Sequence, residues 1–279
     1  MTDTRQQYVR VLSIAGSDSG GGAGIQADLK TIAAHGCYGM TAVTALTAQN
    51  TRGVTGIHGV PAAFLKEQLK AVIEDIGVHA VKIGMMHAPE IVEVVAWAID
   101  EYQLPNVVLD PVMVATSGDR LIAHETVQVL VRELFPRTAV VTPNLDEAAL
   151  LLGHPLADEA ALRQAGPALL AMGARAALVK GGHLPGEEVV DALATAGGGE
   201  LALYRGARIA SNNTHGTGCT LSSAIACGLA LGFALPQAVA QARDYVRGGL
   251  AAGAAVRTGS GQGPLDHGFA PVPSRRVEL

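Results

Sequence analysis

Short apolar runs alternate with longer helical patterns through most of this 279-residue chain, and this alternation restricts the fold more than any other feature of the sequence. Runs that end in a glycine, a proline or a polar residue predict buried strands at 9–17, 80–85, 106–112, 138–144 and 176–182. Helical patterns lie between and after them, at 23–35, 61–75, 88–102, 124–134, 146–153, 157–172 and 217–231. Strands that alternate with helices predict an α/β fold of three layers, in which helices cover both faces of a mostly parallel sheet.

A single domain, residues 1–279, accounts for this organisation, although a chain of this size can also form two smaller domains. No internal repeat or long linker divides the sequence. The glycine-rich stretch 196–199 predicts the turn of a hairpin with arms at 189–195 and 200–206. From about residue 260 the sequence is rich in glycine and proline, so we expect the segment 260–279 to be loosely ordered or to fold over the functional site.

Composition excludes several classes of protein. The net charge is −5 and charges of both signs are scattered, so we expect neither nucleic acid nor a membrane surface as a partner. The three cysteines show no CxxC spacing, which argues against a disulfide framework or a zinc cluster and favours a reducing compartment. Because the first ten residues are polar and do not resemble a signal peptide, we expect a cytoplasmic protein that acts on small molecules.

The stretch between Arg208 and Arg243 contains no Asp, Glu, Lys or Arg, which raises the alternative of a membrane span. Its most apolar part, residues 219–235, contains hydroxyl side chains and is shorter than the roughly 20 apolar residues that a span needs. Helices inside layered α/β proteins are equally apolar, because their neighbours cover them almost completely. We therefore interpret residues 217–231 as a buried helix.

The sequence GSDSGGGAG, residues 16–24, follows the first predicted strand and precedes a predicted helix. Glycines at such a place allow the backbone to approach a ligand closely. The pattern resembles a dinucleotide fingerprint only superficially, because the next strand-like stretch ends in the amide of Gln49 and not in an acidic residue. A flexible turn without a ligand is the alternative.

A second glycine turn, in NNTHGTGC at 212–219, opens the most apolar of the predicted helices. The backbone N–H groups of Gly216, Thr217 and Gly218 can converge on an anion at this helix N-terminus and stabilise the charge of a phosphoryl group during its transfer. Cys219 lies in the first helical turn, where the pKa of a thiol is lowered, and is a candidate base or nucleophile. A buried structural cysteine is the alternative.

Charged residues follow three of the predicted strands. Lys180 is one of only five lysines and precedes two glycines at the end of an apolar run, although a surface lysine would look the same. Asp110 and Glu147 follow neighbouring strands, at the sheet edge where open α/β proteins bind ligands, and they can hold Mg²⁺ through water. Glu147 is alternatively an ordinary carboxylate of a first helical turn. His215, beside the second glycine turn, is a candidate phosphate contact or a structural hydrogen-bond partner.

Seven motifs, in this order and at compatible spacing, resemble one family: AGSDSGGGAGIQADLK, TALTAQNT, VKIGMM, LDPVMVATSGDRL, TPNLDEA, KGGHL and NTHGTGCTLSSAIA. Over nearly its whole length the chain is similar to the hydroxymethylpyrimidine/phosphomethylpyrimidine kinases of thiamine biosynthesis, in the ribokinase-like superfamily. The resemblance implies a ribokinase-like three-layer α/β/α fold, a homodimer, and ATP with Mg²⁺ as the phosphoryl donor. It also implies two reactions: 4-amino-5-hydroxymethyl-2-methylpyrimidine is converted to its monophosphate, and the monophosphate to the pyrophosphate.

The resemblance also assigns roles to individual residues. The pyrimidine pocket would contain Gly16, Asp28, Gln49, Met85 and Val112. Mg²⁺ and its water molecules would lie near Asp110 and Glu147, ATP near Lys180, Thr214 and Asn144, and the transferred phosphoryl group at Gly216, Thr217, Gly218 and Cys219. The chain departs from the family at Asn212, where a basic residue often stands, so this position adds no charge to phosphate binding.

Two other functions remain open at this point. The chain could phosphorylate pyridoxal, alone or in addition, because pyridoxal is also a small heteroaromatic molecule with a hydroxymethyl group. It could also be a pyrimidine-binding protein without catalytic activity. Within the kinase reading, the alcohol of the first reaction benefits from a base, whereas the phosphate oxygen of the second is already ionised. We therefore expect Cys219, as a thiolate, to matter far more in the first reaction.

Overall fold

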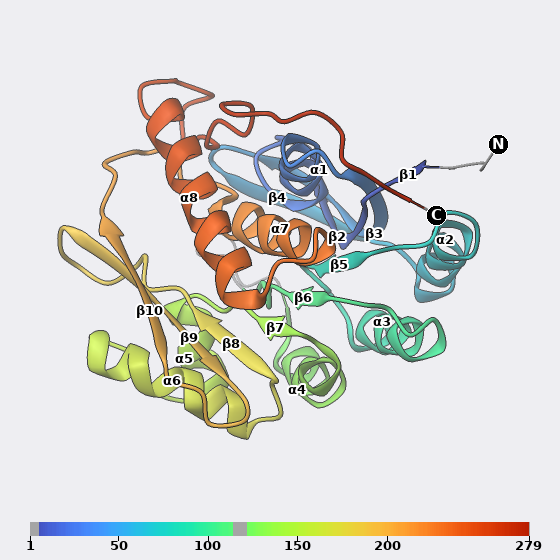
Figure 1. Cartoon of the computed structure of the whole chain (residues 1–279), viewed down its shortest axis with the longest axis horizontal. Coiled ribbons are helices and arrows are strands. Elements are labelled where there is room, and N and C mark those ends of the chain that lie inside the picture. Colours follow the sequence, from blue (N-terminus) through green and yellow to red (C-terminus); the bar gives the residue numbers. More distant parts are fainter. Residues whose placement is uncertain (1–5, 114–121, 279) are drawn as a thin grey trace.

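The computed structural model describes residues 6–113 and 122–278, and a nine-stranded sheet runs through its centre (Figure 1). The parallel strands are β2 (Arg10–Asp18), β3 (Tyr38–Asn50), β5 (Ala80–Ile83), β6 (Val107–Leu109), β7 (Val140–Val141) and β8 (Ala176–Val179). Antiparallel strands extend the edges: β4 (Gly53–Gly59), β9 (Glu188–Thr195) and β10 (Ala202–Ala207). The strand order β10-β9-β8-β7-β6-β5-β2-β3-β4 confirms the predicted, mostly parallel sheet. Residues 114–121, within the motif LDPVMVATSGDRL, lie outside the described residues.

Helices cover both faces of the sheet, as the alternating pattern predicts. One face carries α1 (Gly24–Ala34), α7 (Thr217–Ala230) and α8 (Leu235–Gly253). The other carries α2 (Ala62–Asp75), α3 (Pro89–Glu101), α4 (His124–Leu134), α5 (Leu145–Leu152) and α6 (Glu159–Ala171), with a short 3-10 turn (Phe135–Arg137) after α4. Val11 and Leu12 are neighbours in β2 and are both fully buried, in separate hydrophobic cores on the two faces. Burial on both faces explains why the strands are apolar without alternation.

Helix α7 packs against the sheet, with α1 and α8 as its neighbours on the same face. Its residues from Thr220 to Gly228 are all buried, which confirms the interpretation of this stretch as a buried helix. In the described parts of the chain, no helix has both the length and the apolar character that crossing a membrane requires.

The remaining predicted elements agree with the structure within a few residues, and the hairpin around 196–199 forms as β9 and β10. Helix α8 is the principal element that the sequence reading leaves out. Gly248, Gly249 and Gly253 lower its helical propensity, but each of them leaves space for a segment that packs against the helix.

That segment corrects the prediction of a loosely ordered end from about residue 260. Leu265 and His267 are only 2% and 6% exposed. Further along, β11 (Arg276–Glu278) pairs with β1 (Gln6–Tyr8) in a small antiparallel sheet. Composition suggested a loose segment because glycine and proline favour loops, but the glycines of α8 allow residues 265–269 to pack closely against that helix.

The carboxyl ends of the parallel strands lie along one edge of the central sheet. The two glycine turns and the charged residues that the sequence singles out follow these ends or face them. This is the edge at which open α/β sheets bind ligands, so the fold brings the candidate residues together.

Candidate active site

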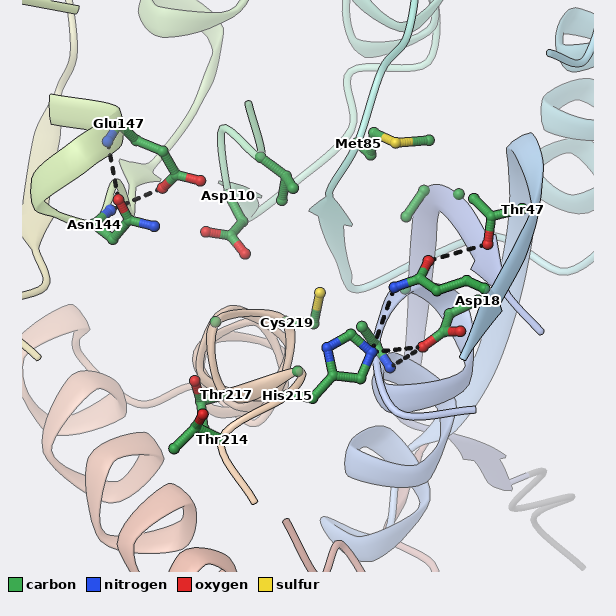
Figure 2. Close-up of a pocket in the computed structure, with 18 of the residues that line it drawn as sticks. Asp18, Thr47, Met85, Asp110, Asn144, Glu147, Thr214, His215, Thr217 and Cys219 are labelled. Carbon is green, nitrogen blue, oxygen red and sulfur yellow. Dashed lines mark hydrogen bonds and ion pairs between the residues drawn. The ribbon is translucent and has the colours of Figure 1, made fainter. Parts of the chain in front are cut away.

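A cavity of about 330 Å³ opens at this edge, and nearly all of the predicted site residues line it (Figure 2). Asn144, Glu147 and Asp110 lie on one side, and Thr47, Asp18 and His215 lie on the other. The predicted residues in its wall are Gly16, Gln49, Met85, Asp110, Val112, Asn144, Glu147, Lys180, Thr214, Gly216, Thr217, Gly218 and Cys219. Asp28 is the exception.

The first glycine turn has a fixed shape, because the buried carboxylate of Asp18 organises it. Asp18 accepts hydrogen bonds from the backbone N–H groups of Gly20, Gly22 and Ala23, at 2.7, 3.0 and 2.8 Å. Burial by itself raises the pKa of Asp18, but these bonds and the contact with His215 outweigh burial and leave the pKa below its usual value. Asp18 therefore fixes the shape of the turn, and contact of the turn with a ligand stays a prediction.

His215 links this turn to the end of β3. Its Nε2 atom lies 2.9 Å from the Oδ2 atom of Asp18, and the imidazole is mostly buried. The amide nitrogen of Gln49 lies 3.5 Å from the same imidazole nitrogen, while the amide oxygen accepts a hydrogen bond of 3.1 Å from Thr47. The structural reading of His215 is thus correct, and its partner Asp18 is a site residue that sequence reasoning missed.

The second glycine turn is pressed against the first. Gly216 has φ = 82°, and a Cβ atom there would lie 1.9 Å from the carbonyl oxygen of Gly22, so only glycine fits. Gly216 is the N-cap of α7 and provides no side-chain cap. The Thr217 N–H group donates to the Thr214 carbonyl at 3.3 Å, so the Gly218 and Cys219 N–H groups are the donors of the first helical turn that face the cavity.

Lys180 and Asp110 face this helix N-terminus as an ion pair. Lys180 donates a hydrogen bond of 2.8 Å to Asp110, which also accepts one of 3.1 Å from Thr142. A Cβ atom on Gly218 would lie 3.2 Å from the Lys180 Nζ and 3.4 Å from the Asp110 Oδ2. Burial raises the pKa of Asp110, but the charges of Lys180 and Lys82 outweigh it and lower the pKa below its usual value. Backbone N–H groups and the Lys180 ammonium group therefore converge on one small space, as an anion requires.

Glu147 is a first-turn carboxylate, as one of its two alternatives predicts, and its role near Mg²⁺ stays a prediction. Its N–H group donates to the Asn144 side chain at 2.9 Å, and its carboxylate accepts from the Asn144 N–H group at 2.8 Å, a capping box at the start of α5. The same carboxylate lines the cavity. Burial raises its pKa to about 7, against the opposing charge of Lys180, and Asp110 adds to the increase. A nearby cation would restore its ionised form.

The predicted lowering of the Cys219 pKa is wrong for the unliganded protein. Burial raises the pKa of this thiol to about 11, although the charge of Lys82 opposes the increase and Asp28 and Asp110 add to it. The helix N-terminus favours the thiolate, but removal from water favours the neutral thiol more strongly. Cys219 nevertheless lines the cavity, and its role as a base or nucleophile stays a prediction.

Asp28 does not reach the cavity. It is fully buried and accepts hydrogen bonds from Ser13, Lys82 and Ser223. Lys82 lies between Asp28 and the cavity, which it lines with a fully buried side chain. We therefore correct the assignment of Asp28 from substrate contact to support of Lys82. A lysine inside the otherwise apolar run AVKIGM was the signal that could have identified Lys82 from the sequence.

A second cavity of about 300 Å³ lies beside the first. The two share a wall, formed by Asn144, Lys180, His183, Thr214, Thr217 and Gly218. All three residues predicted to contact the nucleotide belong to this wall. Two cavities that meet at a helix N-terminus and a lysine can hold a phosphoryl donor and an acceptor with the transferred group between them.

Comparisons with known proteins agree with this chemistry. The sequence profile of a family described as Phosphomethylpyrimidine kinase matches residues 18–266. The chain is 50% identical over 260 residues to the hydroxymethylpyrimidine/phosphomethylpyrimidine kinase of Streptomyces coelicolor, covering 93% of this chain and 94% of that protein.

Two solved structures are similar as well. The crystal structure of phosphomethylpyrimidine kinase from Clostridium difficile has a TM-score of 0.75 at 40% identity, covering 86% of this chain and 98% of that one. An ADP complex of Bacillus subtilis pyridoxal kinase has a TM-score of 0.87 at 35% identity, covering 94% of this chain and 98% of that one.

Proposed function

Because the chain belongs to the phosphomethylpyrimidine kinase family, we propose that it phosphorylates 4-amino-5-hydroxymethyl-2-methylpyrimidine on its hydroxymethyl group and then phosphorylates the monophosphate to the pyrophosphate, with ATP as the donor. The observation that carries the proposal is the wall between the two cavities. There the open N–H groups of α7 and the Lys180 ammonium group face one space, with an acceptor cavity on one side and a donor cavity on the other.

The acceptor cavity suits an aminopyrimidine. Such a ring presents an amino donor beside a ring-nitrogen acceptor, and the Gln49 amide offers an oxygen and a nitrogen with hydrogen-bonding capacity left for both. Met85 and Val112 supply apolar contacts to the ring faces. The Thr47 hydroxyl lies 3.1 Å from the Gln49 amide oxygen, and the backbone N–H group of Gln49 donates to the Ser19 hydroxyl at 2.9 Å, so the residue is held at the cavity before a ligand binds.

In the first reaction the acceptor is an alcohol that must lose a proton. Cys219 lies at the start of α7, where the alcohol would meet the phosphoryl group, and we propose it as the base. Because burial keeps the thiol neutral in the free protein, ionisation must accompany substrate binding, and Lys82 is the charge that favours it. The second reaction needs positioning and neutralisation of charge but no base.

Asp110 and Glu147 fit a magnesium ion that is bound mainly through water and nucleotide phosphates. Mg²⁺ prefers oxygen ligands and commonly takes only one or two carboxylates from the protein. In the described ranges, no group of three or more His, Cys, Asp or Glu side chains could form a complete metal cage, which suits such a site. When bound, the ion would neutralise negative charge on the phosphates, and it would favour the ionised form of Glu147 over the protonated one.

Phosphorus NMR tests the proposal. Purified protein is incubated with the hydroxymethylpyrimidine and MgATP, with pyridoxal in a parallel sample. We expect a monophosphate signal that gives way to a pyrophosphate signal. A product from pyridoxal alone would favour the pyridoxal kinase alternative, for which the similar Bacillus subtilis structure is the specific observation. No product in either sample would favour a binding protein without catalytic activity.

We also propose that the chain is one ribokinase-like domain that acts as a cytoplasmic homodimer, as the family resemblance implies. Light scattering of the purified protein over a range of concentrations tests the assembly. A mass that stays at one chain throughout would contradict the homodimer.

A further inference from the structure

The segment that follows α8 is packed closely against that helix. We refer to residues 258–269 as the C-terminal strap. Its residue Asp266 donates a backbone hydrogen bond of 3.1 Å to the Gly249 carbonyl. A Cβ atom on Gly249 would lie 2.7 Å from the Leu265 side chain, and one on Gly253 would lie 2.9 Å from the Asp266 nitrogen. The glycines of α8 therefore fix the strap at a short distance from the helix.

The strap is bonded to the backbone of the second glycine turn. The N–H group of His215 donates to the Gly263 carbonyl at 3.1 Å. A Cβ atom on Gly263 would lie 2.2 Å from the side-chain oxygen of Asn213, so the strap passes directly over the residues before the turn. Asn213 itself donates two hydrogen bonds of 2.6 Å to the carbonyls of Gly253 and Val256, just before the strap begins.

The His267 side chain of the strap reaches the N-cap of α7 through Thr220, away from the cavity. The Nε2 atom of His267 lies 3.0 Å from the Thr220 hydroxyl, and that hydroxyl donates a hydrogen bond of 2.9 Å to the Gly216 carbonyl. A hydroxyl has one hydrogen, so His267 donates to Thr220 while Thr220 donates to Gly216. Thr220 is fully buried and His267 is 6% exposed, and among the described residues neither lines the cavity.

The other end of the strap holds the turn between β3 and β4, which directly follows Gln49. The Gln262 and Gly261 N–H groups donate to the backbone oxygen and the hydroxyl of Thr51, at 2.8 and 3.1 Å. Arg52 donates a hydrogen bond of 2.7 Å to the Ser260 hydroxyl. The strap therefore connects the strand that carries the substrate amide to the turn that receives the phosphoryl group.

We propose that the C-terminal strap is a positioning element of the kinase reaction and that His267 is its positioning residue, acting through Thr220 on the Gly216 peptide. The inference rests on the proposed function. The Gly216 carbonyl is the first acceptor of α7 and accepts from the Thr220 N–H group at 2.9 Å, so its direction sets the start of the first helical turn, which carries the N–H groups of Gly218 and Cys219. A small rotation of this peptide moves those donors away from the transferred group.

We expect His267→Ala to lower kcat in both reactions by about 10- to 100-fold, since a displacement of about 1 Å at a reacting centre has effects of this size. The KM for the pyrimidine should stay within about twofold, because His267 acts at the turn and not at Gln49. His267→Gln keeps a donor near the position of Nε2 and should recover most of the loss. Amide hydrogen exchange at Thr220, whose N–H group donates to the Gly216 carbonyl at 2.9 Å, should be faster in His267→Ala than in the wild type.

A double-mutant cycle with Thr220→Val tests the route. If His267 acts through Thr220, adding His267→Ala to Thr220→Val should lower kcat little further, whereas independent effects would multiply. Val272→Ala is the control. Val272 follows the strap and packs over Gly36, where a Cβ atom would lie 3.2 Å from its side chain, so the variant should lower the melting temperature slightly and leave kcat largely unchanged.

Two results would overturn the inference. The first is a His267→Ala variant that melts earlier but keeps kcat in both reactions within twofold. The second is a double variant in which the kcat losses of His267→Ala and Thr220→Val multiply. If His267→Ala does not fold, Thr220→Val tests the inference without it, because this variant leaves the strap intact. Thr220→Val must then lower kcat, while its control Thr220→Ser keeps the hydroxyl and should not. A wild-type protein without kinase activity would contradict the proposed function instead, and hydrogen exchange at the turn would still test the positioning role.

Discussion

The two glycine turns lie against each other, yet they are stabilised in opposite ways. The first turn surrounds the carboxylate of Asp18, which takes up its N–H groups from inside. The second turn has no side-chain cap, and other segments hold it from outside through its carbonyl and its flanking residues. The first turn therefore hydrogen-bonds to itself, whereas the second turn leaves the N–H groups of Gly218 and Cys219 facing the cavity. A glycine-rich motif by itself does not distinguish the two cases.

The largest effect should come from the contact between the turns. In Gly216→Ala, the new Cβ atom meets the Gly22 carbonyl and the residue must keep a positive φ, so the turns must separate. We expect both reactions to slow by about 10³-fold or more. Gly232→Ala is the control, because Gly232 also has a positive φ but no atom lies within 4 Å of its added Cβ. Equal losses in the two variants would show that backbone strain, and not the contact, is responsible.

The second-largest effect should come from removing the Lys180 ammonium group, which faces the second turn. Lys180→Ala removes the point charge between the cavities and leaves Asp110 without its ion-pair partner. We expect kcat/KM for ATP to fall by about 10²- to 10³-fold in both reactions. Lys70→Ala, at a partly exposed lysine of α2, is the control for loss of charge. Unchanged ATP kinetics in Lys180→Ala would leave Lys180 with a structural role only.

Acid should destabilise the support behind the second turn. Burial, with help from the charge of Lys30, lowers the pKa of His267 to about 4, below its ordinary value of 6.5. Between these values the unfolded chain binds a proton at His267 that the folded chain does not. The free energy of unfolding should therefore fall by roughly 2–3 kcal/mol as the pH drops from about 6.5 to 4, and this contribution should not change further below pH 4. Urea unfolding of the wild type and His267→Gln across this range measures it. The difference between the two curves should change by this amount across the range, because only the wild type carries the imidazole, and parallel curves would contradict the assignment.

Cys219→Ala shows whether the Cys219 thiol acts as a base or only lies near the reacting groups. If Cys219 takes the proton of the alcohol, the first reaction should slow by about 10²-fold while the second changes by no more than about threefold. Each substrate is assayed separately at saturating MgATP. Equal losses would mean that the thiol stays protonated throughout, as burial favours in the free protein.

The smallest effect concerns the first turn. Asp18→Asn replaces one acceptor oxygen by a donor among several N–H groups, and the stability should fall by about 1–2 kcal/mol in urea unfolding. We expect kcat to fall less than in Gly216→Ala, because the first turn provides shape. A comparable loss of kcat with unchanged stability would mean that the first turn also contacts the ligand directly.

The sequence predicts most of the fold, because the strands are buried on both faces and their apolar runs are unambiguous. It also places nearly all site residues, since each follows the carboxyl end of a strand or opens α7. The sequence does not show how burial changes the pKa of a side chain. The helix position of Cys219 suggests a low pKa, and only the packing around it reverses that direction.

Partners far apart in sequence were missed for a related reason. Asp28 lies beneath Lys82, and His267 reaches Thr220, through contacts that depend on how helices and strands are arranged in space. Local patterns do not encode such pairs. Helix α8 was not predicted for the same reason, because its glycines lower the helical propensity and their role is to leave space for a distant segment that packs on them.

The strap also has a consequence for the order in which the protein is made. A ribosome delivers the chain from its N-terminus, so Asp18 and the first turn emerge long before Gly263 and His267 can reach the second. A nascent chain can therefore carry most of the residues of the acceptor cavity while the phosphoryl-binding turn still lacks its support. Activity should arise late, in one step, when the last contacts close.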